Sequence, residues 1–275
     1  MKILRLLALP VLLVSCSCTT KVVTDDSWLF KVNKKPLISL VYYPVPIDTK
    51  RRLAEPDLKT DSWTVTKMKL DIERFNELGI DVLKIKLDPF NKMGVNDAAL
   101  KSFLKLLKEE KGFKIILSAE CRSRDNISIR SFLDWSFSLN IYNHPAYMTC
   151  NNKPIVELVN VADPVLKLIG LYIDYKTWHV KHEYSSYPEL KFTQLSNKKD
   201  EIKVVAALRG RYTWIKRNPA SFQHCFQTLA QIGFKFIEID SWNDYSKGSF
   251  IEPNTHDGRL FFDTLKRNVK QLKQK

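Results

Sequence analysis

The feature that most limits what this chain can fold into is an alternation of short apolar runs with segments of helical periodicity. Short continuous apolar runs are typical of strands that are buried on both faces of a sheet. Seven such runs are clear, at 37–43, 80–87, 113–119, 155–161, 168–173, 202–208 and 234–240. Because strands that alternate with helices form parallel sheets with right-handed crossovers, the pattern predicts an α/β fold.

Between the runs, apolar residues recur at the three- and four-residue spacing of one buried helix face. The first such segment contains Val65, Met68, Ile72 and Phe75. Gly79 follows it, as expected for a helix C-cap, and Asn218 with Pro219 supplies the start of a later helix. A length of 275 residues, of which 44% are apolar, suits one barrel. The sequence therefore predicts a single (β/α)8 barrel of the TIM type, with an eighth strand near 180–195.

The N-terminus has the features of an export signal. Lys2 and Arg5 precede an apolar stretch at 6–14 that is too short for a typical membrane span. Cys16 follows directly behind a serine, which resembles a bacterial lipobox; an ordinary signal peptide or an uncleaved anchor is the alternative. The lipobox predicts an exported protein of the cell envelope, held to a membrane by a lipid on Cys16. The predicted parts are a signal peptide at 1–15, a lipidated tether at 16–34 and the barrel at 35–275.

The chain is strongly basic, with a formal net charge of +14. Loss of Lys2 and Arg5 with the signal peptide leaves 14 − 2 = +12. An exported protein rarely meets nucleic acid, so the charge indicates an anionic membrane surface, an acidic polymer or a solvated lysine-rich surface. Cys121, Cys150 and Cys225 show no metal-ligand spacing, so no metal site is predicted. A Cys121–Cys150 disulfide and buried free thiols remain alternatives.

Polar and aromatic residues recur just past the predicted strands. In a (β/α) barrel these positions lie together at the end that carries the active site. The residues that share this placement are Tyr42, Tyr43, Asp88, Glu120, Arg122, Asp174, Trp178, Arg209, Arg211 and Tyr212. The two tyrosines suit either stacking on a sugar ring or packing beneath a loop.

The densest group follows the last strand, at 241–253. Carboxylates and amides placed between aromatic rings at a strand end are typical of barrels that bind or cleave sugars. Trp242 suits either a stacking platform or the core. Asn243 suits a hydrogen bond to a sugar hydroxyl or the orientation of Asp244.

This segment resembles the C-terminal signature of glycoside hydrolase family 99 and its relatives, including the family 71 glucanases and the WbsX-like group. The matching residues are Asn243, Asp244, Tyr245, Gly248, Ile251, Glu252 and Pro253. The resemblance implies an endo-acting glycoside hydrolase that acts on a complex glycan or polysaccharide without a cofactor. Lys247 departs from it, because the family has a second carboxylate there.

The family's two signature glutamates imply catalytic roles for two positions. The first falls on Asp244 and would assist the sugar's own 2-hydroxyl as nucleophile, while the second, the general acid and base, falls on Lys247. An ammonium with a pKa near 10 is a weak acid at neutral pH and accepts no proton while charged. Another carboxylate would then supply the acid, and the candidates are Glu120, Glu238 and Glu252. For Glu252 the alternative is a structural role in holding the loop.

Two other interpretations of Lys247 stay open. The barrel would bind glycans without cleaving them, with Lys247 pairing to an anionic group, or Lys247 would be a buried lysine of lowered pKa. A role in polysaccharide synthesis is a further, weaker alternative. The residues predicted to contact the carbohydrate are Tyr42, Tyr43, Asp88, Trp178, Arg211, Trp242, Asn243, Tyr245 and Lys247.

Overall fold

The computed structural model of the chain describes residues 35–44, 54–57, 63–87, 97–109, 112–120, 126–150, 153–159, 179–183, 201–205, 207–209, 215–232, 236–245 and 249–274. Its strands are β1 (Leu37–Tyr42), β2 (Val82–Leu87), β3 (Lys114–Glu120), β4 (Thr149–Cys150), β5 (Lys153–Val159), β6 (His179–Glu183), β7 (Glu201–Val205), β8 (Ala207–Arg209), β9 (Ile215–Arg217) and β10 (Phe236–Asp240). Its helices are α2 (Val65–Leu78), α3 (Asp97–Glu109), α4 (Asn126–Ser138), the 3-10 turn η2 (Ile141–Asn143), α6 (Pro219–Ile232) and α7 (Leu260–Gln274).

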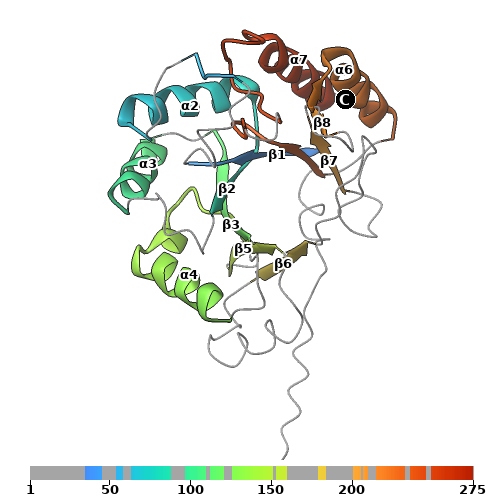
Figure 1. The fold of residues 1–275 in the computed structure, drawn as a ribbon. Coiled ribbons are helices and arrows are strands. Elements are labelled where there is room, and N and C mark those ends of the chain that lie inside the picture. Colours follow the sequence, from blue (N-terminus) through green and yellow to red (C-terminus); the bar gives the residue numbers. More distant parts are fainter. Residues whose placement is uncertain are drawn as a thin grey trace, which may run out of the picture.

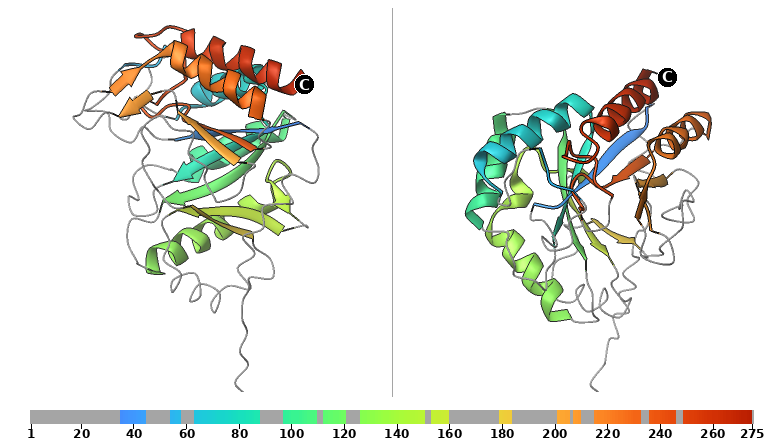
Figure 2. Two further views of the ribbon diagram at one scale, coloured as in Figure 1. Left: turned by 90° about the vertical axis from the view of Figure 1, so that its right-hand side faces the viewer. Right: turned by 45° about the horizontal axis from the view of Figure 1, so that its top comes forward.

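The strands form a curved parallel sheet with the helices on its outer side (Figure 1). Neighbouring strands follow the order β6, β5, β3, β2, β1, β10 and β7, and every one of these pairs is parallel. The first strand thus lies between the second and the last, where Ile38 pairs with Ile237 and Leu40 with Ile239. Two further views show the helices covering the outside of the sheet (Figure 2). The fold is the predicted (β/α) barrel.

The helices begin and end for the reasons that the sequence indicates. The hydroxyl of Thr64 accepts a hydrogen bond from the backbone of Lys67 and caps α2, and Gly79 ends it in the left-handed conformation at φ 69°. The Asn218 side chain caps α6 in the same way. The predicted apolar faces of α2, α3 and α7 are buried, apart from Val65, which is exposed. Each large side chain buried on these faces stabilises the fold by about 1.5–3 kcal/mol.

Three strand predictions need comment. The run at 202–208 was expected to form one strand, but the chain leaves the barrel after β7, and β8 pairs instead with β9 in an antiparallel hairpin. The predicted eighth strand corresponds to β6, at the start of the expected range. The predicted strand at 168–173 lies outside the described residues, as do the proposed signal peptide and tether. In the part of the chain that the structure describes, no helix has both the length and the apolar character to cross a membrane.

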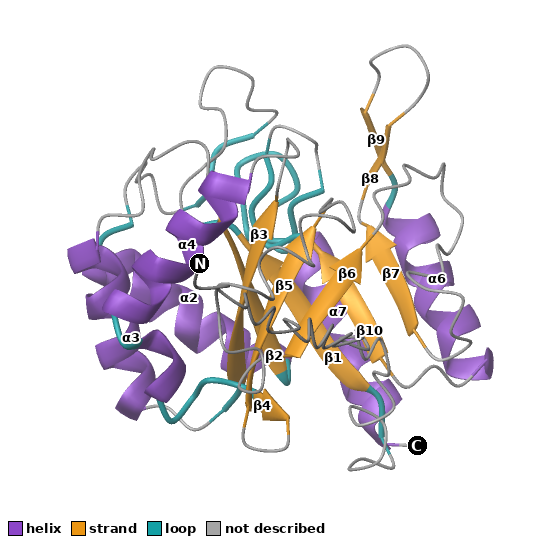
Figure 3. Ribbon diagram, turned by 90° about the horizontal axis from the view of Figure 1, so that it is seen from below, coloured by secondary structure: helices purple, strands orange, loops and turns teal. Residues whose placement is uncertain are grey.

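The two ends of the barrel differ in what they carry. The amino-terminal ends of the strands lie near β4 and the C-terminus of α7, and the β8–β9 hairpin projects from the opposite end (Figure 3). Apolar side chains fill the lumen at the amino-terminal end, where Leu37 contacts Phe236 and Val82 packs with Ile116 and Ile155. Above this layer the lumen becomes polar, which departs from the branched apolar layers usual in such barrels.

Candidate active site

The loop after β10 is fastened to the end of β1, at the carboxyl-terminal mouth of the barrel. The backbone N–H of Trp242 donates to the carbonyl of Val41 at 2.7 Å. The Asn243 side chain accepts a hydrogen bond from the N–H of Tyr43 at 3.0 Å and donates one to its carbonyl at 2.7 Å. Asn243 therefore joins two loops that are 200 residues apart in the sequence.

Backbone hydrogen bonds fix the position of Asp244 at this mouth. Its N–H donates to the hydroxyl of Ser241 at 3.0 Å, and the N–H of Ser241 donates to the carbonyl of Ser249 at 2.7 Å. Only 2% of Asp244 is exposed. A carboxylate in such a fixed position can act as a base, or orient a hydroxyl, without reorganising.

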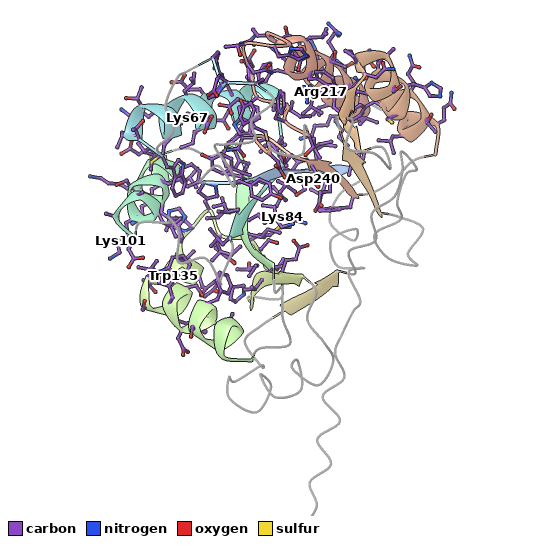
Figure 4. All side chains as sticks on the ribbon, in the orientation of Figure 1. Lys67, Lys84, Lys101, Trp135, Arg217 and Asp240 are labelled. Carbon is purple, nitrogen blue, oxygen red and sulfur yellow. The ribbon has the colours of Figure 1, made fainter. Side chains whose placement is uncertain are left out.

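A buried network lies behind the loop, between it and α2. The Lys67 ammonium bridges the carboxylates of Asp71 and Glu252. Neutral donors complete the network: the Tyr42 hydroxyl and the Trp242 indole donate to Asp71 at 2.9 and 3.2 Å, and the Tyr245 hydroxyl donates to Glu252 at 2.9 Å. Lys67 lies on α2, in the outer layer of helices (Figure 4). We call these six residues the wall cluster.

The wall cluster has two carboxylates for one ammonium, and this imbalance shifts the pKa values. Burial raises the pKa of Glu252, and the charge of Asp71 adds to it against the attraction of Lys67, so that the pKa is about 7. Burial lowers the pKa of Lys67, but the two carboxylates outweigh it and raise the pKa overall. Burial and the neighbouring carboxylates raise the pKa of Tyr42 and Tyr245 as well, so both remain protonated donors.

The wall cluster changes how four predicted site residues are interpreted. Tyr42, Trp242 and Tyr245 are 1%, 0% and 5% exposed. Because a ring that stacks on a sugar needs an exposed face, these aromatic side chains serve the barrel wall in this structure. Both oxygens of Glu252 are engaged by Lys67 and Tyr245, and the residue is 1% exposed. Its contacts are those of a carboxylate that holds the loop.

The far side of the loop is clamped by Arg217, at the end of β9. Its guanidinium carbon lies 3.7 Å from the centre of the Phe250 ring and 4.1 Å from that of Phe261. It also donates to the Asp257 carboxylate at 2.7 Å. Phe250 in turn stacks on Tyr245 at 4.5 Å. The loop is therefore anchored to β1, α2 and the hairpin, so its backbone is positioned from three sides.

A second lysine-centred cluster occupies the lumen, and sequence reasoning missed it apart from Glu238. The Lys84 ammonium binds Glu157 at 2.8 Å and also binds Glu238. The Ser118 hydroxyl donates to Glu157 at 2.7 Å. Since β5 and β10 lie on opposite sides of β2, with another strand between in each case, these contacts cross the lumen. We call Lys84, Ser118, Glu157 and Glu238 the lumen cluster.

Above the lumen cluster, the strand ends present further charged groups. Asp240 ends β10 and is half-buried, and Lys86 on β2 is half-buried with its ammonium 5.9 Å from the centre of the Tyr43 ring. Figure 4 shows Asp240 and Lys84 within the ring of strands. Tyr43 itself is 5% exposed. Glu120 ends β3, where its backbone pairs with Val159.

Several predicted residues cannot be placed. Asp88, Trp178, Arg211, Lys247 and the proposed lipidation site Cys16 lie outside the described residues. Cys225 is a buried thiol on α6, whereas Cys121 lies outside the described part, so the disulfide stays a prediction. Among the residues that the structure describes, no three His, Cys, Asp or Glu side chains are grouped so as to hold a metal ion.

Comparison with known proteins identifies relatives by structure alone. No family profile matches the chain, and no curated protein does. The GH99 endo-alpha-mannosidase from Bacteroides thetaiotaomicron superposes with a TM-score of 0.62 when bound to bis-tris-propane, at 13% identity over 86% of this chain and 97% of that one. A second structure of that enzyme gives 0.60 at 14% identity over the same shares. A glycoside hydrolase-like protein gives 0.63 at 12% identity over 86% and 95%. At such identities these likenesses establish the barrel fold.

Proposed function

We propose that the protein is an endo-acting glycoside hydrolase that uses Asp244 at the mouth of the barrel. The observation that carries the proposal is the position of Asp244, buried and fixed on a loop that is anchored to β1, α2 and the β8–β9 hairpin. The fold shared with an endo-alpha-mannosidase and the signature at 241–253 support the same reaction class. Asp244 would act as the base that assists the nucleophile.

The second catalytic group of this proposal is Glu120. Glu252 is bound by Lys67 and Glu238 by Lys84, so neither is free to deliver a proton to a leaving group. Residue 120 ends β3 at the mouth, two positions beyond Ser118, whose hydroxyl faces the lumen. Glu120 would protonate the glycosidic oxygen and then accept a proton from water.

Cleavage of polysaccharides tests the proposal, with an α-mannan in the panel because of the activity of the structural neighbour. Release of oligosaccharides from mid-chain positions is expected for the wild-type chain. Asp244→Asn should lower kcat by about 10²–10⁴-fold, which is the usual contribution of a positioned acid or base. The exposed Asp134→Asn on α4 is the matched control and should leave kcat unchanged. Equal activity of the two variants would remove Asp244 from the mechanism.

The role of Glu120 needs a substrate that does not require acid. Glu120→Gln should lose activity on the polysaccharide but keep most of it on an aryl glycoside with an acidic phenol, since such a leaving group departs without protonation. The variant should also lose the basic limb of the pH–rate profile. A uniform loss on both substrates would point to a structural role for Glu120.

A second candidate function is glycan binding without cleavage. Lys247 favours it, because this residue stands where the family pattern has the second carboxylate. This alternative predicts that the wild-type chain retains polysaccharides in affinity electrophoresis but releases no oligosaccharide. It further predicts that Lys247→Glu introduces cleavage. Cleavage by the wild-type chain that Lys247→Glu does not increase would contradict it.

The proposal also places the protein in the cell envelope, with a lipid on Cys16. The supporting observation is the sequence, an apolar stretch at 6–14 followed closely by this cysteine. Metabolic labelling with an alkyne fatty acid should tag the wild-type chain and the Cys18→Ala variant but not Cys16→Ala. Labelling that persists in Cys16→Ala would overturn the anchor.

A further inference from the structure

The described residues contain a cavity of about 260 Å³ far from the mouth of the barrel. It lies between α3 and the turn that joins α4 to η2, and its polar lining is Lys101, Lys105, Lys108, Asn140, Asn143 and His144. Leu104 and Leu139 give it an apolar floor. We call it the lysine cavity.

The three lysines of this cavity form one row on α3, at helical spacing, and all are exposed. Lys101 projects from the outer side of the helix (Figure 4). Like charges at this spacing repel one another by a few tenths of a kcal/mol per pair. Within the described ranges no carboxylate forms an ion pair with any of the three, although Glu109 lies on the same helix. On α7, by contrast, Lys266 and Lys273 are paired with acids.

The opposite wall of the cavity is uncharged, and hydrogen bonds hold its histidine. The Nδ1 atom of His144 accepts a hydrogen bond from the N–H of Ala146 at 3.1 Å, so its Nε2 carries the proton and donates to the carbonyl of Leu104 at 2.8 Å. Burial lowers the pKa of His144, and the charges of Lys108 and Lys114 lower it further. An uncharged imidazole and two side-chain amides face three ammonium groups, so the cavity suits a small, strongly charged anion.

The position of the cavity at one end of the barrel indicates which kind of molecule would carry that anion. The C-terminal half of α3 lies at the amino-terminal end of the strands, where the Lys114 ammonium donates to the carbonyl of Pro145 at the cavity rim. β1 begins at this same end, so the preceding residues join the barrel there. From Cys16 to Lys35 the chain advances 35 − 16 = 19 residues, which reach at most about 65 Å when extended.

We propose that the lysine cavity binds the phosphate of anionic phospholipid headgroups. This inference rests on the membrane anchor of the proposed function, which would keep this end of the barrel close to a lipid surface. Binding there would turn the mouth with Asp244 away from the membrane, toward glycans outside it. Each lysine near an anionic surface strengthens the attachment, and the effect weakens as salt screens the charges.

Vesicle binding by the full chain tests this proposal in a Cys16→Ala background, where no lipid is attached. Vesicles of phosphatidylcholine alone are compared with vesicles that also contain phosphatidylglycerol. The variant Lys101→Gln/Lys105→Gln/Lys108→Gln should bind the anionic vesicles about 10–100-fold more weakly than the parent. The matched control removes the same charge from the first part of α2 and from the first half of α7 with the residue before it, through the exposed residues Lys69→Gln/Arg259→Gln/Lys266→Gln, and should change binding by less than about 3-fold.

Two results would overturn the proposal. Equal losses in both triple variants would show that net charge alone attracts the protein to the vesicles. Protection of the three lysines from acetylation by inorganic phosphate, without any dependence on anionic lipid, would assign the cavity to a free anion. Polysaccharide cleavage by the same variants should stay at the parent level. A failed vesicle assay is therefore distinguishable from a failure of the hydrolase proposal, which the cleavage assay tests. Because the Cys16→Ala background carries no lipid, the vesicle assay is also independent of whether the wild-type chain is lipidated.

Discussion

The wall cluster and the lumen cluster are built alike, since each places one buried lysine between two carboxylates. Their surroundings differ. Lys67 lies behind the barrel wall, and its carboxylates also accept from two tyrosines and a tryptophan. Lys84 lies inside the barrel, where Ser118 donates to Glu157 and the half-buried Asp240 and Lys86 lie above at the mouth.

The comparison teaches that the same charge pattern occurs in two settings, the wall between α2 and the loop after β10 and the lumen of the barrel. The aromatic donors of the wall cluster come from β1 and the signature loop, so its hydrogen bonds fix the loop that carries Asp244. The lumen cluster instead places charged side chains inside the barrel, below its mouth. A buried ion pair is costly to break, because the partner left behind has no water to replace the lost charge.

The largest effect should come from removing the lysine of the wall cluster. Lys67→Met leaves Asp71 and Glu252 buried without their cation, and we expect the free energy of unfolding to fall by about 3–5 kcal/mol in urea titrations. Lys69→Met, at an exposed position on the same helix, is the control and should change it by less than about 0.5 kcal/mol. A loss below about 1 kcal/mol for Lys67→Met would mean that the wall cluster does not hold the loop.

The corresponding change in the lumen should cost somewhat less. Lys84→Met leaves Glu157 and Glu238 buried without their cation, and we expect a loss of about 3 kcal/mol, at the lower end of the range for a broken buried pair. Adding Glu238→Gln removes one of the two stranded charges and should recover at least about 1 kcal/mol, which a double-mutant cycle measures. If the two effects simply added, the two residues would not act as one cluster.

The smallest effect is a dependence on pH that belongs to the wall cluster. The pKa of Glu252 is raised to about 7 in the folded state, so the folded chain binds a proton that the unfolded chain releases near pH 4.5. The contribution of Glu252 is therefore full below about pH 4.5 and is lost as the pH rises through about 7. Relative to Glu252→Gln, the wild-type stability should fall by roughly 2 kcal/mol between pH 5 and pH 7.

Glu77→Gln provides a control of opposite sign. A hydrogen bond from Lys266 lowers the pKa of Glu77, so its small contribution is present above the unfolded pKa and is lost as the pH falls. Unfolding curves of both variants across the same pH range distinguish the two cases. A wild-type stability that rises toward pH 7 relative to Glu252→Gln would contradict the assignment.

Much of the fold follows from periodicity in the sequence. The apolar faces of α2, α3 and α7 predicted their helices, and Gly79 and Asn218 marked ends that the structure confirms. The β8–β9 hairpin was missed, because an apolar run does not reveal where the chain turns away from a sheet. Pairing partners decide that: β7 pairs with the distant β10, whereas β8 pairs with its neighbour β9.

The site was predicted less well, for a physical reason. The loop after β10 was recognised from its composition, but composition does not tell an exposed tryptophan from one that donates to a buried aspartate. Trp242 and Tyr42 are wall residues because both donate hydrogen bonds to Asp71 on α2. Lys84 and Glu157 did leave a signal, because each is a charged residue between apolar neighbours in a strand. A buried charge is stable in such a place only when a partner of opposite charge lies nearby.

The pairing of β1 with β10 has a consequence for how the chain folds. The Asn243 side chain binds the backbone of Tyr43, which lies 200 positions earlier in the sequence. Closing so long a loop costs conformational entropy before the contact stabilises the fold. A growing chain holds β1 with one edge unpaired until residues 236–240 have emerged. Such an edge is open to association with other chains. The mouth of the barrel, where the loop after β10 is fastened to the end of β1, therefore closes only after these late residues have been synthesised.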